Sequence, residues 1–299
     1  MLTDASAQSR AFDDARLLGL GWNELLDEDA ETAVRAFFEE QGARLSTSSA
    51  LDSVILTALG GSWTWPAARI VYPLPGRESV DRDGVLEGVV LGHDVDVEWV
   101  MPRATPTGLR LYTVHAEFAQ GSSTKGVDES LGLSRFRALP SHASEHEIPW
   151  TPGLTAGRRA LSHELVGLAR RMLAIAVQHV SVRQQFGRPL GANQAVQHRL
   201  ADAQVEILSA AMLAEETWVT ATPLAVAAAK ALASQAFNTI ATNGQQVLGA
   251  IGFTWEHEWR HLVRRGFLLS TLLGATDECE REISNEIAAV GVTRIGHLT

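Results

Sequence analysis

The sequence predicts an α+β protein in which helical regions enclose a small β region. Apolar residues recur at helical spacing in the first 60 residues. Between residues 61 and 150 the chain turns to short β-prone runs separated by Pro and Gly. From residue 151 to 299 the helical spacing returns and continues. We therefore expect an N-terminal helical segment at 1–60, a middle β domain at 61–150 and a helical bundle at 151–299.

The N-terminal region predicts two helices. Val34, Phe37 and Phe38 lie at helical spacing after the acidic residues 27–29, which suit the positive end of a helix dipole. A second, shorter apolar helix is predicted over residues 51–59.

The middle region predicts a small antiparallel sheet. Its β-prone runs lie at residues 68–72, 85–91, 95–100 and 109–114. Segments such as P-L-P-G at 73–76 separate these runs and are typical of turns.

The C-terminal region predicts long packed helices. Leucines and other apolar residues recur every three or four positions from Leu161 to His179. Further helical segments are predicted over 196–212, 224–244, 256–273 and 277–290. The Ala-rich stretch at 224–244 permits close helix packing, so a bundle is expected.

Bulk composition narrows the functional classes. The chain has 299 residues, 45% of them hydrophobic, and a formal net charge of −10. That charge argues against nucleic acid or an anionic membrane surface as the main partner. A single cysteine, Cys279, excludes an internal disulfide, and no secretory signal or long uninterrupted apolar run is visible. We expect a cytoplasmic protein.

The most informative segment reads R-Q-Q-F-G-R-P-L at residues 183–190. The guanidinium of Arg183 can bind a pyrophosphate through two parallel hydrogen bonds. Gln185 can add a hydrogen bond, Phe186 a stacking face, and Gly187 a turn. A helix-terminal arginine followed by a glycine stop would explain a shorter match. The longer string, continued by matching residues at 194–202, favours cofactor binding.

A second segment reads Q-V-L-G-A-I-G-F at residues 246–253. Gly249, Ala250 and Gly252 would let the backbone approach a phosphate, with Gln246 reaching toward the cofactor. A loop of small residues between two helices is the alternative interpretation.

Residues 257–261 read H-E-W-R-H, which matches a zinc-binding pattern. A working site needs a third ligand, and the neighbouring Arg260, Arg264 and Arg265 would repel a dication. The segment is better explained by the resemblance that follows, and no metal is predicted.

These segments, with T-W-E-H at 254–257 and L-G-L-G-W at 18–22, resemble the acyl-CoA dehydrogenases. The resemblance is strongest from residue 161 to 276. It implies an N-terminal helical domain, a β domain and a C-terminal four-helix bundle that together hold FAD and an acyl-CoA thioester. In the family a glutamate removes the α-proton while the β-hydrogen leaves as hydride to the flavin.

The same comparison implies that this chain has no catalytic base. The family's usual Y-E-G-T string aligns with Leu272–Thr276, which contains no carboxylate. The position used by a minority of members falls at about Gly157. The T-E-P-x-A-G-S-D-like string that lines the flavin ring is absent from the corresponding residues 65–73.

The resemblance therefore implies a non-catalytic subunit of a heteromeric, α2β2 acyl-CoA dehydrogenase. Such a subunit would share FAD with its partner, and the acyl-CoA substrate, by analogy a steroid side chain, would lie mainly on the partner. The residues expected to contact FAD are Arg183, Gln185, Phe186, Gln246, Gly249 and Ala250.

Two alternatives stay open at this point. The chain can be a self-sufficient dehydrogenase with a relocated base, for which Glu164, Asp277 and Glu278 are candidates. It can also be a non-enzymatic helical interaction protein that kept the fold and lost the cofactor.

Overall fold

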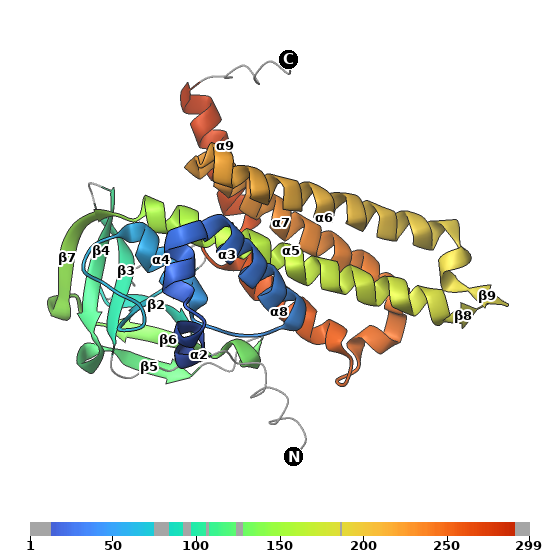
Figure 1. Ribbon diagram of the computed structural model, residues 1–299, viewed down its shortest axis with the longest axis horizontal. Coiled ribbons are helices and arrows are strands. Elements are labelled where there is room, and N and C mark those ends of the chain that lie inside the picture. The colour runs from blue at the N-terminus through green and yellow to red at the C-terminus, as the bar shows by residue number, and fades with distance from the viewer. Residues whose placement is uncertain are drawn as a thin grey trace.

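A computed structural model describes residues 13–74, 84–91, 97–105, 108–123, 128–185 and 187–290. A β region lies at one end of the molecule, and long helices extend away from it (Figure 1). The predicted α+β class is confirmed. In the N-terminal region the helices are α2 (Asp14–Gly19), α3 (Trp22–Arg44) and α4 (Ala50–Leu59).

The acidic residues 27–29, predicted to begin a helix, lie inside α3, where the helix is interrupted at Asp29. Asp29 has non-helical backbone angles (φ −152°, ψ 76°), and its side chain accepts a hydrogen bond from the Thr32 N–H at 3.0 Å. Asp29 therefore caps the second part of α3, as an acidic residue at a helix start is expected to do. Trp22 and Leu26, in the first part, are buried in the same core as Val34 and Phe38.

The described strands of the β region form two sheets. One has the order β1 (Ala68–Ile70), β3 (Glu98–Thr105), β4 (Gly108–His115), β7 (Ala143–Pro149), and the other β2 (Leu86–Leu91), β6 (Leu133–Ala138), β5 (Gln120–Ser123). The pairing is antiparallel throughout except between β1 and β3, which run parallel. The prediction of a wholly antiparallel sheet was wrong there because the chain passes through β2, in the other sheet, before it returns beside β1.

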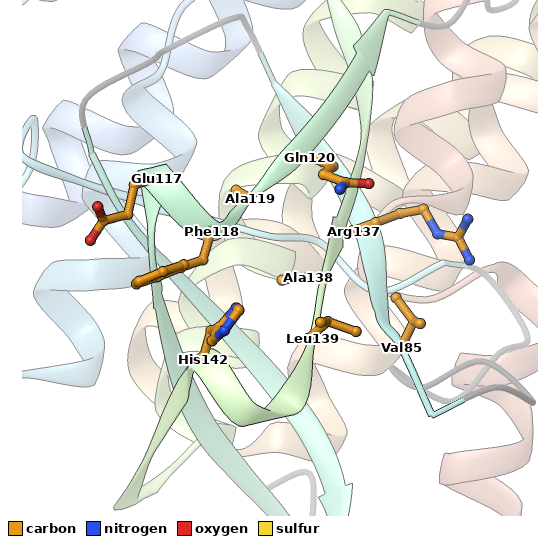
Figure 2. Close-up of a pocket in the computed structure, with 9 residues that line it drawn as sticks. All are labelled: Val85, Glu117, Phe118, Ala119, Gln120, Arg137, Ala138, Leu139 and His142. Atoms are coloured by element: carbon orange, nitrogen blue, oxygen red, sulfur yellow. The ribbon is translucent and has the colours of Figure 1, made fainter.

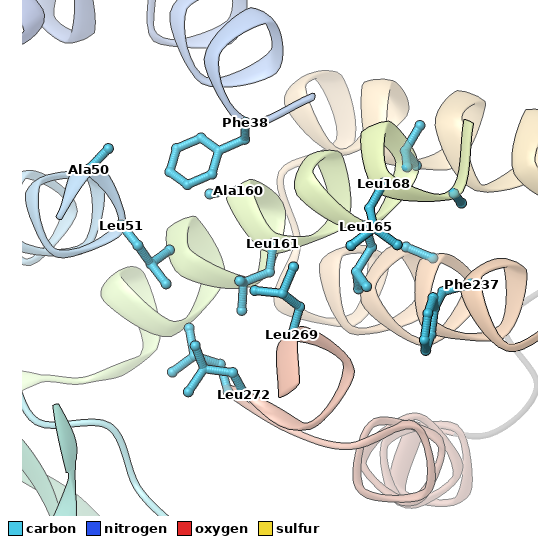
Figure 3. Close-up of a cluster of buried hydrophobic side chains, with 14 of the residues drawn as sticks. Phe38, Ala50, Leu51, Ala160, Leu161, Leu165, Leu168, Phe237, Leu269 and Leu272 are labelled. Atoms are coloured by element: carbon cyan, nitrogen blue, oxygen red, sulfur yellow. The ribbon is translucent and has the colours of Figure 1, made fainter. Parts of the chain in front are cut away.

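The helical region is built around α5 (Thr151–Val182). It packs against α3, α4, α6 (Gln194–Thr220), α7 (Pro223–Leu248) and α8 (Glu258–Thr271). Helix α9 (Thr276–Val290) packs against α7. Figure 3 shows α5 contributing Leu161, Leu165 and Leu168 to the core that these helices share.

Helix α5 has the length and apolar composition of a membrane-crossing helix, the one such case among the described residues. Buried residues extend along it from Gly153 to Val180 and contact the surrounding helices. Its apolar character is accounted for by this place in the core.

Candidate functional site at the end of the bundle

The two segments singled out in the sequence lie at one end of the helical bundle. Helix α5 ends there and α7 ends there, so Arg183 and Gln246 share the end from which a small hairpin projects (Figure 1). The pKa of His179 is lowered by partial burial and by the nearby charges of Arg183 and His257, which links the end of α5 to the start of α8. Phe186 lies outside the described residues.

The first segment forms that hairpin. The Arg183 N–H donates to the His179 carbonyl at 2.9 Å, and the Leu190 N–H donates to the Arg183 carbonyl at 2.8 Å. Gly187 turns the chain with φ of 78°, a conformation that favours glycine. The side chains of Arg183 and Gln185 are exposed. Within the described residues the Arg183 guanidinium makes no hydrogen bond, so it does not cap the last carbonyls of α5 as the alternative interpretation requires.

The second segment begins where α7 ends. Gly249 adopts φ of 63°, its N–H donates to the Gln245 carbonyl, and a short 3₁₀ helix runs over Gly249–Phe253. A Cβ atom added to Gly249 would meet no atom within 4 Å. Gln246 and Ala250 are exposed. Gly249 thus leaves space for a ligand to approach the backbone, but its N–H is already bonded to the Gln245 carbonyl.

Aromatic and cationic side chains next to this loop were missed by the sequence reasoning. Phe253 and Trp255 are 75% and 54% exposed. The Arg260 guanidinium carbon lies 3.4 Å from the centroid of the Trp255 ring, and that of Arg264 lies 5.7 Å away. In the sequence, Trp255 precedes Arg260 by five positions. This spacing indicates a contact only when it is known that α8 begins between the two residues, at Glu258.

The histidines of the zinc-like pattern have structural surroundings of their own. His257 precedes α8, and its Nδ1 accepts a hydrogen bond from the Trp259 N–H at 3.1 Å. The ring of His261 packs edge-on against Trp255, with centroids 6.4 Å apart. In the part of the chain that the structure describes, no three His, Cys, Asp or Glu side chains gather as a metal site would require.

The segment aligned with the family's usual base, Leu272–Thr276, lies against Gly157, near which the alternative position for a base falls. Leu273 follows α8 and is buried, and Gly157 faces it from α5. A Cβ atom added to Gly157 would lie 2.5 Å from Leu273 Cδ1 and 2.9 Å from Ile55 Cδ1. The space at this point is filled by the side chains of Leu273 and Ile55.

Buried cations hold the bend at Leu273. Arg158 Nε donates to the Leu273 carbonyl at 2.7 Å, and its two terminal nitrogens bind Glu282 at 2.6 and 2.7 Å. Lys230 Nζ donates to the carbonyls of Ser270 at 3.0 Å and Gly274 at 3.5 Å. Burial lowers the pKa of Lys230 to about 7.

The three candidate relocated bases lie in other surroundings. Glu164 is buried, and its pKa is raised to about 7 by burial, against the opposing effect of Arg265 at 3.9 Å. Asp277 is exposed and pairs with Arg281 at 3.2 Å. Glu278 Oε2 accepts from the Ala275 N–H at 3.0 Å at the start of α9.

A separate cavity of about 380 Å³ lies in the β region (Figure 2). The Phe118 and His142 rings stand beside each other on one side of it, with centroids 4.3 Å apart. Arg137 lines it too, and its Nε lies 2.9 Å from the buried Glu87. None of the residues predicted to bind a cofactor lines this cavity.

The C-terminal helical region is similar in sequence to known proteins. Residues 150–288 match the acyl-CoA dehydrogenase C-terminal domain family. The acyl-CoA dehydrogenase IpdE2 of Mycobacterium tuberculosis is 34% identical over 213 residues, which cover 71% of this chain and 62% of IpdE2. The match thus spans less than two thirds of that relative.

Solved structures resemble nearly the whole chain. A structure described as a Tcur3481-Tcur3483 steroid ACAD variant superposes with a TM-score of 0.76 at 20% identity, covering 93% of this chain and 88% of that one. The ChsE4-ChsE5 complex from Mycobacterium tuberculosis superposes with a TM-score of 0.71 at 19% identity, covering 89% and 87%. The chain therefore has the acyl-CoA dehydrogenase fold, and its C-terminal helical region belongs to the acyl-CoA dehydrogenase C-terminal domain family.

Proposed function

We propose that this chain is a subunit of an FAD-dependent acyl-CoA dehydrogenase complex that completes the binding site for the FAD tail and leaves proton abstraction to its partner. The observation that carries the proposal is the contact between Gly157 and Leu273. The segment aligned with the usual base and the alternative position near Gly157 meet there, and apolar side chains occupy the space. At the other end of α5, the exposed side chains of Arg183 and Gln185 support the proposed contact with the FAD tail.

The residues present at the bundle end fit a dinucleotide tail. Arg183 offers a planar, permanently charged donor for a pyrophosphate. The exposed amides of Gln185 and Gln246 add hydrogen-bond donors, and Gly249 leaves room for close approach. These groups project from the end of the bundle instead of lining an enclosed cleft, as expected when a second chain provides the opposite wall.

In the proposed complex this chain binds and orients, and its partner performs the acid–base step. Bound FAD would accept the β-hydrogen of the thioester as hydride. Arg183 would hold the pyrophosphate, while Gln185 and Gln246 fix its orientation. Leu273 and Ile55 exclude water and offer no proton acceptor. The partner would therefore carry the carboxylate and the acyl-CoA.

The relatives suggest the class of assembly and substrate. One similar structure is described as a steroid ACAD and another as a complex of two named proteins. A heteromeric α2β2 enzyme acting on the CoA ester of a steroid side chain is the form of the proposal that these descriptions favour. Fold alone does not determine a substrate, so the chemistry of the partner decides this point.

The test is the flavin content of the complex after Arg183→Ala. Loss of a charge-assisted bidentate contact should cost roughly 1.5–3 kcal/mol of FAD binding, which makes the dissociation constant about 10- to 150-fold larger. Arg281→Ala, at an exposed arginine on α9, is the matched control and should leave flavin affinity unchanged. Unchanged affinity in Arg183→Ala would favour a non-enzymatic interaction protein instead.

A further inference from the structure

Helix α6 carries an apolar stripe that faces solvent. Val205, Leu208, Met212 and Val219 are 62%, 49%, 70% and 82% exposed. With 3.6 residues per turn, these four positions fall within an arc of about 60° and extend over about 21 Å of helix. Surface helices usually present polar side chains outward, so exposed apolar side chains aligned on one side of a helix mark an interaction surface.

The stripe is separate from the face by which α6 joins the bundle. Ala203, Ile207, Ala210 and Ala214 are buried where α6 packs against α5 and α7. Helix α6 therefore has two apolar faces, and the bundle covers one of them. The residues proposed to bind the FAD tail lie outside the stripe, which begins three turns into α6.

The charge around the stripe selects its occupant. Asp202, Glu215 and Glu216 are exposed beside it, and the sequence has no lysine or arginine between residues 200 and 220. Glu215 lies 3.5 Å from Arg35 of α3, and both side chains are about half exposed. Asp202 and Glu216 supply further negative charge beside the stripe. A second copy of this chain would bring two acidic flanks together. A partner with basic flanks would be attracted.

We propose that the α6 stripe docks a helix of the partner dehydrogenase subunit, one that presents an apolar stripe flanked by lysine or arginine. This inference rests on the proposed function, since it assigns a surface to the partner invoked there. Paired apolar stripes would pack as in other helix–helix interfaces. Met212, at the middle of the stripe, can adapt its shape to the partner.

The experiment compares Met212→Glu and Val219→Glu with Ile287→Glu, an exposed apolar position on α9. Each chain is co-expressed with the acyl-CoA dehydrogenases of its own genome, one at a time, and complexes are sized by light scattering after gel filtration. The lone variants should keep the helical circular dichroism and melting temperature of the original chain, because these side chains lie outside the core.

We expect both stripe variants to weaken the heteromeric complex by roughly 30-fold or more, and Ile287→Glu to leave it intact. Raising the salt concentration should also weaken the original complex, because charges at the flanks are screened. Intact complexes in both stripe variants would overturn the assignment of α6, as would failure of every dehydrogenase to bind the original chain. A homodimer that the stripe variants disrupt would make a second copy the occupant.

The outcome is distinguishable from failure of the proposed function. If Arg183→Ala loses flavin while the stripe variants still form complexes, the function stands and the α6 surface is wrong. If the stripe variants dissociate but Arg183→Ala keeps its flavin affinity, the surface stands and the FAD-tail role is wrong.

Discussion

Leu273 occupies a backbone conformation that is unusual for its residue type. Its φ is 59°, a left-handed value that costs roughly 1–2 kcal/mol for a residue with a Cβ atom. Burial against Ile55 and Gly157 offsets this cost, and Arg158 binds the carbonyl of the same residue. A charged side chain at this position would lose these apolar contacts and would be crowded by its neighbours.

The ionisation of Glu164 affects the stability of the folded protein. Its pKa rises from 4.5 to about 7 in the folded protein, so the folded state retains a proton that the unfolded state releases between these values. Folding stability should therefore fall as the pH rises from 4.5 to about 7, and the penalty is complete above that range. Lys230 affects stability in a different pH range. Its pKa falls from 10.5 to about 7 on folding, so its contribution to folding stability improves as the pH rises from about 7 to 10.5.

Glu164→Gln should remove this dependence. At pH 7 to 8 we expect the variant to be more stable than the original chain by roughly 1–3 kcal/mol, with the difference vanishing toward pH 4.5. Urea unfolding at a series of pH values measures it, and Glu147→Gln, at an exposed carboxylate, should change nothing. An undiminished fall in stability between pH 4.5 and 7 in Glu164→Gln would show that another group titrates there.

At the scale of elements, α3 and α5 cross at a pair of glycines. A Cβ atom added to Gly42 would lie 2.1 Å from the Glu164 carbonyl oxygen, and one added to Gly167 would lie 2.0 Å from that of Glu39. Both obstacles are backbone atoms of the facing helix. The two backbones can approach this closely because neither position has a side chain.

Gly167→Ala should therefore destabilise the protein. Alanine favours a helix interior by up to about 1 kcal/mol over glycine, but the clash with a backbone oxygen forces the helices apart at a cost of roughly 1–3 kcal/mol or more. Thermal and urea unfolding measure the net effect. Gly121→Ala, where an added Cβ meets no atom within 4 Å, should be close to neutral. A variant as stable as the original would show that the crossing can widen without cost.

Helical periodicity was enough to predict the long helices. The helix expected to end at Arg183 is α5, and the segments expected at 256–273 and 277–290 are α8 and α9 with shifted ends. Strands β5, β6 and β7 were not predicted. The residues of β5 and β7, such as A-S-E-H-E-I-P, are polar and mostly exposed, and two arginines lie among the apolar residues of β6, L-S-R-F-R-A. An edge strand with little apolar content gives no periodic signal.

Some residues of the candidate site could be predicted from the sequence, and others could be found only from the fold. Arg183, Gln185, Gln246, Gly249 and Ala250 were predicted from short strings, and their role in binding FAD stays a prediction. The contact between Gly157 and Leu273 was beyond sequence reasoning, because it depends on how α5 meets the bend after α8. The stacking of Arg260 on Trp255 likewise requires the turn before α8 to be in place.

At the scale of the whole molecule, Arg265 joins its regions. From α8 it donates to Asp128 at 2.5 Å in the β region and to the Ser46 carbonyl at 2.8 Å in the N-terminal region. Such buried, fully engaged charge networks fix the relative orientation of the elements they connect. The β region and the near end of the bundle are thus held together, while the far end projects from them with its exposed donors (Figure 1).

We propose that this chain completes a flavin site that it does not form alone. The most direct test is the visible absorption spectrum of the purified chain, recorded alone and in complex with its partner dehydrogenase. We expect a flavin band from the complex and none from the lone chain. A lone chain that carries stoichiometric FAD and oxidises an acyl-CoA thioester would contradict it and would show that the chain supplies its own base.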